Sequence, residues 1–468
     1  MAAAGSRSAW FRTIPLEMRR VGLVFRTVGE RTSQAAYELA IEHIQPDEVH
    51  VIENVRPFSE ALRRSLQIDF SCDAVVFMDA DCLITEDITG VLQSEQRPYV
   101  DSLVLDKFRG YVQAGVHLTR IDVVQAMRDV EIPDEDKELV TSAEHVVRRA
   151  AMRRLGLPYA RRPLPILHDF CQFHRDIFAK YVLRELRCRT PYQRLKLAAY
   201  HEEWEQDPHD VDYQVARQAI AYSRRHLPGD ADSARTARFL ADLPQTASQV
   251  LRRTGIAEKP PLTRAQAVQQ AATVRPARRQ LSGPGKIFGI GLALTRTTRL
   301  TAALTRLGFA VLHAPDDWST LGELQAGQYD LSLLAHFDGA VETIAPFFAP
   351  LDRQFPASKF ILTVCDTDAW LAAMAARWGT QPVFDPAAGQ PDNLADRQRW
   401  LHKRSYCTIQ YDPDRLARAY TRHTHEVRAY FRDRPESLLI IDFSSGAGWD
   451  ALCEFLGVPP PRNHFPEP

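Results

Sequence analysis

Two aspartates stand two positions apart, directly after a run of apolar residues. The run AVVFM at 74–78 predicts a strand, and Asp79 and Asp81 follow it. Because alternate residues of an extended chain point the same way, both carboxylates can address one site. Mg²⁺ and Mn²⁺ bind such oxygens and complete their octahedron with water and phosphate. On a nucleotide diphosphate, the ion would neutralise the charge that builds up when a sugar leaves.

Two later acids are candidates for the base that activates an acceptor hydroxyl. Asp101 lies in VDSLVLDKF, and Asp169 lies in PILHDFCQFHRDIF. His168 is a candidate third metal ligand, because imidazole accepts Mn²⁺. Asp169 has an alternative role as the N-cap of a helix over 170–186, and the two roles do not exclude each other. We expect His174 to be an ordinary residue on a face of that helix.

The elements before Asp79 alternate between strand and helix. Apolar runs predict strands at 21–26 and 48–52, and a helix after Thr32 and another at 59–66 separate the three strands. This order is typical of a parallel sheet with right-handed crossovers, whose ligands bind beyond the carboxyl ends of the strands. Further helices are predicted at 137–155, 170–186, 191–204 and 212–225.

Residues about 20 to 225 resemble a glycosyltransferase of the GT-A type. The likeness rests on VGLVFRTVGERT, VHVIENVRPFSEAL and DAVVFMDADCLITEDI. The resemblance implies that Asp79-Ala80-Asp81 is the metal-binding D-x-D motif of that family. It also implies that the loop after the first strand contacts the base and ribose of the nucleotide. The candidate nucleotide-binding residues are Arg26, Thr27, Glu30, Arg31, Asn54 and Asp79, and the loop arginines have the alternative of being solvated surface charges.

A second α/β pattern begins at Lys286. Strands are predicted at 286–291, 310–312, 358–364 and 438–442, with a further one at 329–334 and a helix at 297–307. The segment FGIGLALTRTTRL at 288–300 resembles the 5′-phosphosulfate loop of the sulfotransferase family, and the likeness covers about 285 to 465. In such loops backbone N–H groups and a helix N-terminus cradle a phosphate.

The departures from that family fall on groups that would touch the cofactor. Leu294 stands at the lysine position, Cys365 at an arginine position and Ala373 at a serine position. Loss of the lysine removes a charge-assisted contact worth roughly 1.5–3 kcal/mol. We therefore expect a degenerate cofactor site that does not bind phosphoadenosine phosphosulfate tightly. Arg296 or Arg299 would restore some positive charge.

The composition is that of a globular protein, with 45% hydrophobic and 25% charged residues in 468. The formal net charge of −1 gives no electrostatic argument for nucleic acid or an anionic membrane. The first twenty residues do not resemble a secretory signal, and no apolar run is long enough to span a bilayer. The seven cysteines are scattered without C-x-x-C, which favours reduced thiols and a cytoplasmic location.

The sequence thus predicts two α/β modules. The first is a GT-A-like, Rossmann-like domain at 15–226 with a helical C-terminal extension, and the second is a sulfotransferase-like, P-loop-like domain at 285–465. A partly helical linker is expected at 227–284, where Pro, Gly, Ala, Gln and Arg are mixed. The predicted function is a Mn²⁺- or Mg²⁺-dependent glycosyltransferase that uses a nucleotide-sugar donor.

The predicted acceptor is a carbohydrate or other hydroxyl compound, and the second module is expected to be inactive or to bind a protein partner. Two alternatives are a sulfotransferase-like enzyme with a modified phosphate loop and a non-enzymatic scaffold protein.

Overall fold

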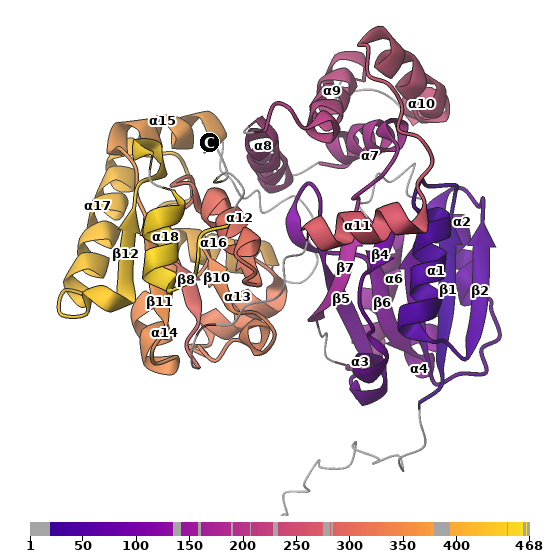
Figure 1. Ribbon diagram of the computed structural model, residues 1–468, viewed down its shortest axis with the longest axis horizontal. Helices are drawn as coiled ribbons and strands as arrows, with labels where there is room; N and C mark the ends of the chain where they lie inside the picture. The colour runs from indigo at the N-terminus through magenta and orange to yellow at the C-terminus, as the bar shows by residue number, and fades with distance from the viewer. Residues whose placement is uncertain are drawn as a thin grey trace, which may run out of the picture.

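The protein consists of two α/β modules that lie side by side (Figure 1). The computed structural model describes residues 19–133, 142–157, 161–188, 191–205, 207–227, 233–274, 281, 284–378, 394–446, 448–461 and 465. Predictions for the first 18 residues and for most of 275–283 fall outside this part of the chain. The predicted fold class, two α/β modules, is confirmed.

The N-terminal module is built on a seven-stranded mixed sheet with the order β2-β1-β3-β6-β5-β7-β4. Strands β1, β2 and β3 are parallel, as the alternating pattern predicts. The strands are β1 (Val21–Thr27), β2 (Glu48–Glu53), β3 (Ala74–Asp79), β4 (Cys82–Ile84), β5 (Tyr99–Asp106), β6 (Gly110–Arg120) and β7 (Arg161–His168).

Helices cover both faces of this sheet, because successive residues of each strand point to opposite faces. On β3, Val76 packs into the core beneath α1, whereas Val75 packs into the core beneath α2, α4 and α6. These helices are α1 (Ser33–Ile44), α2 (Phe58–Leu66), α3 (Thr89–Ser94), α4 (Ile121–Arg128) and α6 (Ala143–Leu155).

A separate helical layer stands beyond the carboxyl ends of the strands (Figure 1). It comprises α7 (His174–Arg187), α8 (Pro191–Glu205), α9 (Val211–His226) and α10 (Ser233–Arg253), which share a core around Phe178 and Trp204. Helix α11 (Arg264–Val274) returns to the sheet and packs against α1. The segment between the modules therefore contains helices that pack on the N-terminal module.

The C-terminal module has a five-stranded, all-parallel sheet with the order β12-β11-β8-β10-β9. Its strands are β8 (Ile287–Gly289), β9 (Val311–His313), β10 (Gly339–Val341), β11 (Lys359–Thr363) and β12 (Leu438–Ile441). Its helices are α12 (Thr297–Arg306), α13 (Trp318–Gln325), α14 (Phe348–Gln354), α15 (Thr367–Trp378), α16 (Leu394–Tyr406), α17 (Pro413–Tyr430) and α18 (Trp449–Leu456).

The strand predicted at 329–334 is wrong. A 3₁₀ turn, η1 (Ser332–Ala335), stands there, and the missing strand is β10. A strand of three residues is too short to show a period in the sequence. Shorter 3₁₀ turns are η2 (Ala345–Phe347), η3 (Pro435–Ser437) and η4 (Phe443–Ser445).

Ion pairs and a small apolar cluster join the two modules. Lys196 Nζ lies 2.8 Å from Asp316 Oδ1, and Arg161 Nη1 lies 2.6 Å from Asp317 Oδ2. Tyr111 and Phe337 pack edge to face in the same interface. Among the helices that the structure describes, none is long and apolar enough to cross a membrane.

Candidate metal and nucleotide site

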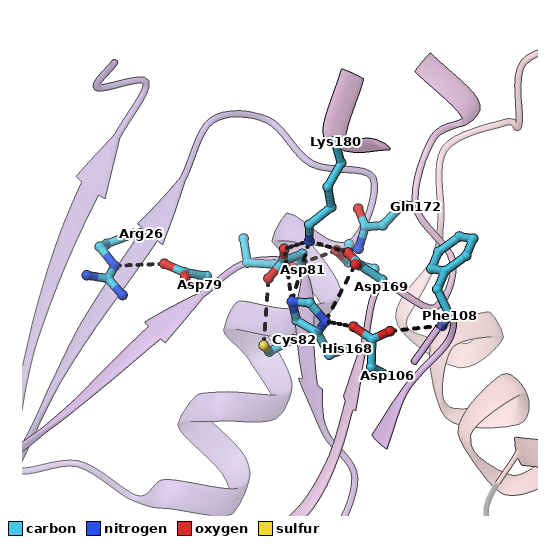
Figure 2. A network of polar contacts seen from close by, with 12 residues as sticks. Arg26, Asp79, Asp81, Cys82, Asp106, Phe108, His168, Asp169, Gln172 and Lys180 are labelled. Atoms are coloured by element: carbon cyan, nitrogen blue, oxygen red, sulfur yellow. Dashed lines mark hydrogen bonds and ion pairs between the residues drawn. The ribbon is translucent and has the colours of Figure 1, made fainter. Parts of the chain in front are cut away.

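The carboxyl ends of three strands bring acidic and imidazole side chains together at one edge of the sheet. β6 pairs antiparallel with both β3 and β5, so β3 and β5 run in the same direction, and β7 runs parallel to β5. Asp81 follows β3, Asp106 ends β5, and His168 ends β7. After Asp81 the chain crosses to β4, which pairs with β7 so that Cys82 lies opposite His168. Figure 2 shows the resulting cluster.

A bulge in β6 makes room for this cluster. Between two paired positions, β6 runs from Gln113 to His117 while β5 advances only from Leu103 to Asp101. Gly115 lies inside this irregularity with φ of +60°. A Cβ atom there would lie 2.4 Å from Cys82 Sγ, so a residue without a side chain is needed. β-Bulges often redirect the chain next to active sites in this way.

His168 is oriented by a carboxylate behind it. Its Nδ1 lies 2.6 Å from Asp106 Oδ2, and the Phe108 N–H and the Arg109 guanidinium also donate to Asp106. With Nδ1 directed to Asp106, Nε2 faces Asp81 at 3.4 Å. A carboxylate behind a histidine is the usual support of a metal-binding imidazole. Burial lowers the pKa of His168, but Asp169 and the other carboxylates outweigh it and raise the pKa to about 9.

Lys180 on α7 reaches into the same cluster. Its Nζ lies 2.8 Å from Asp81 Oδ2, 2.6 Å from Asp169 Oδ1 and 3.5 Å from His168 Nε2. Burial opposes charge on these groups, yet the ammonium holds the pKa of Asp81 well below its usual value, and the two carboxylates raise the pKa of Lys180. The ammonium therefore pairs with two carboxylates at once and offsets one of their two negative charges.

The donor set fits a divalent cation. Asp81, His168, Cys82, Asp106 and Asp169 form two overlapping groups whose ligand atoms lie within 4.8 Å of one another. Asp169 is 1% exposed, and its Oδ2 has no hydrogen-bond partner in the part of the chain that the structure describes. A buried carboxylate oxygen without a donor is costly unless a cation or water satisfies it. Carboxylate and imidazole ligands suit Mn²⁺, and carboxylates suit Mg²⁺.

Asp79 is held apart from this cluster by a buried arginine. Arg26 is 4% exposed, and its Nε donates to Asp79 Oδ1 at 2.7 Å. Its two terminal nitrogens bind both oxygens of Glu144 at 2.8 and 3.1 Å. Burial alone would lower the pKa of Arg26, but these two carboxylates raise it above its usual range. Arg26 is thus a buried clamp on Asp79, meaning that it fixes the position of the Asp79 side chain. We expect Arg26 to affect nucleotide binding only through the Asp79 carboxylate.

The other loop residues lie beside Asp79 and bind one another. Glu30 Oε2 accepts from the Thr27 hydroxyl at 2.8 Å and from the Val28 N–H at 2.9 Å. Arg31 donates to the carbonyl oxygens of Pro260 at 2.6 Å and Cys171 at 2.9 Å, which ties the loop to the helical layer. Asn54 is exposed in the left-handed conformation at the end of β2.

Of the two predicted bases, only Asp169 lies in the cluster. Asp101 is 4% exposed near the opposite end of β5, roughly 15 Å along the strand from Asp106. Its carboxylate accepts from the Tyr99 hydroxyl and from Arg148. The prediction that Asp169 caps a helix is wrong, because α7 begins at His174 with Phe173 as its N-cap.

Four residues in or beside the cluster were not predicted from the sequence: Cys82, Asp106, Lys180 and Gly115. Asp106 carried a signal, because it is the acid at the carboxyl end of its strand. Gly115 interrupts an otherwise regular strand, which is a common mark of a bulge. Lys180 carried no signal, because nothing in its spacing from His168 or Asp81 shows where α7 lies.

In the C-terminal module, residues 288–300, which resemble a phosphosulfate loop and are here called the phosphate-type loop, make hydrogen bonds with other parts of the module. The Ala293 N–H donates to the Tyr406 hydroxyl at 3.2 Å, and the Trp370 indole donates to the Ala293 carbonyl at 2.8 Å. Leu294 and Arg296 both have left-handed φ. Arg299 donates to the Phe443 carbonyl at 3.0 Å, and its guanidinium lies over the ring of Phe443, just after β12.

A cavity of about 1430 Å³ lies between the two modules and not at the acidic cluster. Its walls come from the phosphate-type loop, from Cys365 and Ala373, and from the β5–β6 turn at Arg109. Arg109 binds Asp106, and Asp106 binds His168. Only the Asp106 side chain therefore stands between this wall of the cavity and the imidazole.

No curated protein matches the chain. Solved structures similar to it include a glycosyltransferase involved in glycosylation of the major capsid of PBCV-1, with 13% identity over 32% of this chain and 94% of that one (TM-score 0.24). The catalytic domain of Drosophila β1,4-galactosyltransferase 7 has 13% identity over 31% and 64% (TM-score 0.23). The glycosyltransferase GlyE of Streptococcus pneumoniae has 10% identity over 77% and 100% (TM-score 0.21).

The family comparison concerns the C-terminal module. Residues 286–468 match the model of the sulfotransferase domain, and this range begins where β8 begins. The resemblance stated for the phosphate-type loop thus extends over the whole second sheet and its helices. The chain therefore resembles the sulfotransferase domain family over its C-terminal module.

Proposed function

We propose that the N-terminal module is a metal-dependent glycosyltransferase that uses a nucleotide-sugar donor. The observation that carries the proposal is the cluster of Asp81, His168 and Asp169 at the carboxyl edge of the sheet, with Asp106 supporting the imidazole. Ligands of parallel sheets bind at this edge. Asp81 of the D-x-D motif belongs to the cluster, and Asp79 and the loop after β1 lie next to it, which supports the resemblance to GT-A enzymes.

Each residue has a role that follows from its contacts. Asp81, His168 and Asp169 would hold Mn²⁺ or Mg²⁺, which supplies a Lewis acid for the charge on the leaving diphosphate. Asp106 accepts from His168 Nδ1, which directs Nε2 toward the ion, and binding of the ion would displace the proton on Nε2. Arg26 keeps Asp79 at the edge of the site, where its side chain is 27% exposed and able to meet the donor.

Charge around the site also agrees with binding of an anionic donor. Lys180 lies directly in the cluster, at hydrogen-bonding distance from Asp81 and Asp169. We propose that the second module has no sulfotransfer activity, because Leu294 replaces the lysine of the phosphate loop and Tyr406 occupies one loop N–H. The acceptor, a carbohydrate or another hydroxyl compound, would approach the open side of the edge.

The first prediction tests this function by calorimetry. UDP and GDP, each with and without Mn²⁺, are titrated into the wild-type protein and into Asp81→Ala. We expect one of the two nucleotides to bind only with Mn²⁺, and Asp81→Ala to weaken that binding at least tenfold while the protein stays folded. The reason is that the substitution removes one of three charged or imidazole ligands.

Asp87→Ala is the matched control, because Asp87 is an exposed acid just beyond β4 whose carboxylate accepts from the N–H and hydroxyl of Thr89. Metal-independent nucleotide binding, or equal binding by Asp81→Ala, would exclude the proposed site.

Phosphoadenosine phosphate serves as a third ligand. A saturable thermal shift with it would favour the sulfotransferase alternative, because a ligand that binds the native state stabilises it.

A further inference from the structure

The Lys180 ammonium stands where the proposed metal ion would be bound. It contacts one oxygen each of Asp81 and Asp169 at hydrogen-bonding distance and lies 3.5 Å from His168 Nε2. Asp81 and His168 belong to one of the two groups of side chains that could hold a cation, and Asp169 and His168 belong to the other. Figure 2 shows the lysine side chain ending between the two carboxylates, with the imidazole on the other side.

The contacts of Asp169 indicate that the cluster has capacity for more positive charge than the lysine supplies. One of its carboxylate oxygens binds the ammonium, and the other is buried without a hydrogen-bond donor among the described residues. A lysine carries one charge and offers its donors to few partners, whereas a divalent ion can bind all three ligands. Lys180 therefore offsets only part of the negative charge of the cluster and leaves one oxygen of Asp169 without a hydrogen-bond donor among the described residues.

A divalent ion and the ammonium cannot share this position. Both would lie within about 3 Å of the same carboxylate oxygens, and like charges at that separation repel strongly in a partly buried site. Lys180 has a path out, because its side chain is 31% exposed and extends from α7, which stands beyond the strand ends. Asp81 and Asp169 are held by backbone pairing and remain in place, since the Asp169 N–H donates to the Asp81 carbonyl at 3.1 Å.

We propose that Lys180 is a built-in cation that competes with the divalent metal for Asp81, His168 and Asp169. Without metal, its ammonium keeps the two carboxylates charged and close together. When the ion binds, the ammonium leaves the cluster, so every metal-binding event includes the loss of two ion-pair contacts. The inference rests on the metal site of the proposed function and adds a reason why the free protein would bind metal weakly.

The test is direct metal binding without any nucleotide. Free Mn²⁺ is measured by its electron paramagnetic resonance signal during titration of the wild-type protein, Lys180→Met and Lys180→Arg. Lys180→Met is expected to bind Mn²⁺ at least tenfold more tightly than the wild type, because the competing cation is gone. Lys180→Arg keeps the charge and is expected to bind no more tightly than the wild type.

Lys107→Met is the matched control. Lys107 also forms an ion pair with an aspartate, Asp210, but lies outside the cluster. Its Mn²⁺ affinity should equal that of the wild type. Equal or weaker Mn²⁺ binding by Lys180→Met would overturn the proposal, as would the same increase in Lys180→Met and Lys180→Arg. If Lys180→Met does not fold, Lys180→Gln replaces it with the same expectation.

The result separates this inference from the proposed function. A tighter Mn²⁺ site in Lys180→Met together with no UDP or GDP binding would support the competing lysine and contradict the glycosyltransferase. Metal-dependent nucleotide binding with unchanged Mn²⁺ affinity in Lys180→Met would support the glycosyltransferase and contradict the competing lysine.

Discussion

The Arg26 side chain binds two carboxylates, those of Asp79 and Glu144. Its contacts with Asp79 and Glu144 are hydrogen-bonded, and the ring of Phe58 lies 4.8 Å from the guanidinium carbon. His117 lies on the far side of Glu144 at 3.0 Å. A buried charge of this kind is tolerated because each of its partners is also charged and hydrogen-bonded.

The second prediction follows from this arrangement. Arg26→Met should lower the free energy of unfolding by about 3–5 kcal/mol, because Glu144 and Asp79 lose their shared counter-charge. Urea denaturation measures the change. Arg120→Met is the control, since its pair with Asp122 is 40% and 47% exposed and should contribute less than about 1 kcal/mol. A loss below 1 kcal/mol in Arg26→Met would contradict the assignment of Arg26 as a buried clamp.

At the scale of elements, β6 connects the two sides of the sheet and its bulge shapes the cluster. The strand pairs with both β3 and β5, so an irregularity in it moves Asp81 and His168 relative to each other. Gly115 provides both the left-handed backbone and the missing side chain. The position of the site therefore depends on the backbone of β6 as well as on its ligands.

Two glycines of β6 give the third prediction. Gly115→Ala and Gly110→Ala each place an alanine at left-handed φ, which costs roughly 1 kcal/mol. Only Gly115→Ala also forces a contact of 2.4 Å with Cys82 Sγ, whereas Gly110 has nothing within 4 Å. Gly115→Ala should therefore melt at a lower temperature than Gly110→Ala and bind Mn²⁺ more weakly. Equal melting and equal Mn²⁺ binding in the two variants would show that the close approach has no role.

Helix α9 supplies the fourth prediction, which concerns pH. Burial raises the pKa of Asp212, but His174 and Lys259 outweigh it and lower the pKa to about 2. Because the folded pKa is below the ordinary value of 3.8, the stabilisation is complete above pH 3.8 and is lost as the pH falls through about 2. Asp212→Asn should lower the free energy of unfolding by roughly 2 kcal/mol at pH 7 and by nearly nothing at pH 2.

Denaturation of both proteins at several pH values measures this difference. Asp396→Asn, at an exposed acid on α16, serves as the control and should change the free energy of unfolding at pH 7 by less than about 0.5 kcal/mol. A constant difference between Asp212→Asn and wild type down to pH 2 would contradict the contribution of the Asp212 charge.

At the scale of the whole molecule, the segment between the modules belongs physically to the first one. Helix α10 buries Leu243, Ala247 and Leu251 in the core of the helical layer. Helix α11 buries Ala267 and Ala271 against α1. A boundary near residue 227 would therefore cut through packed helices, and the structure favours a boundary between α11 and β8.

The fifth prediction tests that boundary. A fragment ending near residue 281 should be soluble, unfold cooperatively and keep Mn²⁺ binding, whereas a fragment ending near residue 229 should aggregate because it exposes the apolar partners of α10 and α11. A fragment starting at residue 284 should fold without Mn²⁺ binding. If neither module folds alone, the ion pairs and apolar cluster between them hold one cooperative unit, and the division is wrong.

The sequence alone was sufficient for the first three strands and the helices between them, for β8, β9, β11 and β12, and for the position of Asp79 and Asp81 at a strand end. Apolar runs separated by helical patterns show where strands stop, so the residues that follow them can be identified. It was also sufficient for the phosphate-type loop and its missing lysine, because loop, strand and helix are adjacent in the chain.

Only the tertiary structure decided which of these groups meet. Periodicity does not reveal that β6 separates β3 from β5, that Asp106 rather than Asp101 lies at the site, or that Arg26 is enclosed. Nor does it place Lys180, which belongs to a helix 99 positions beyond Asp81. The physical reason is that local patterns fix the direction and exposed face of an element, whereas contacts between distant elements depend on packing across the whole sheet.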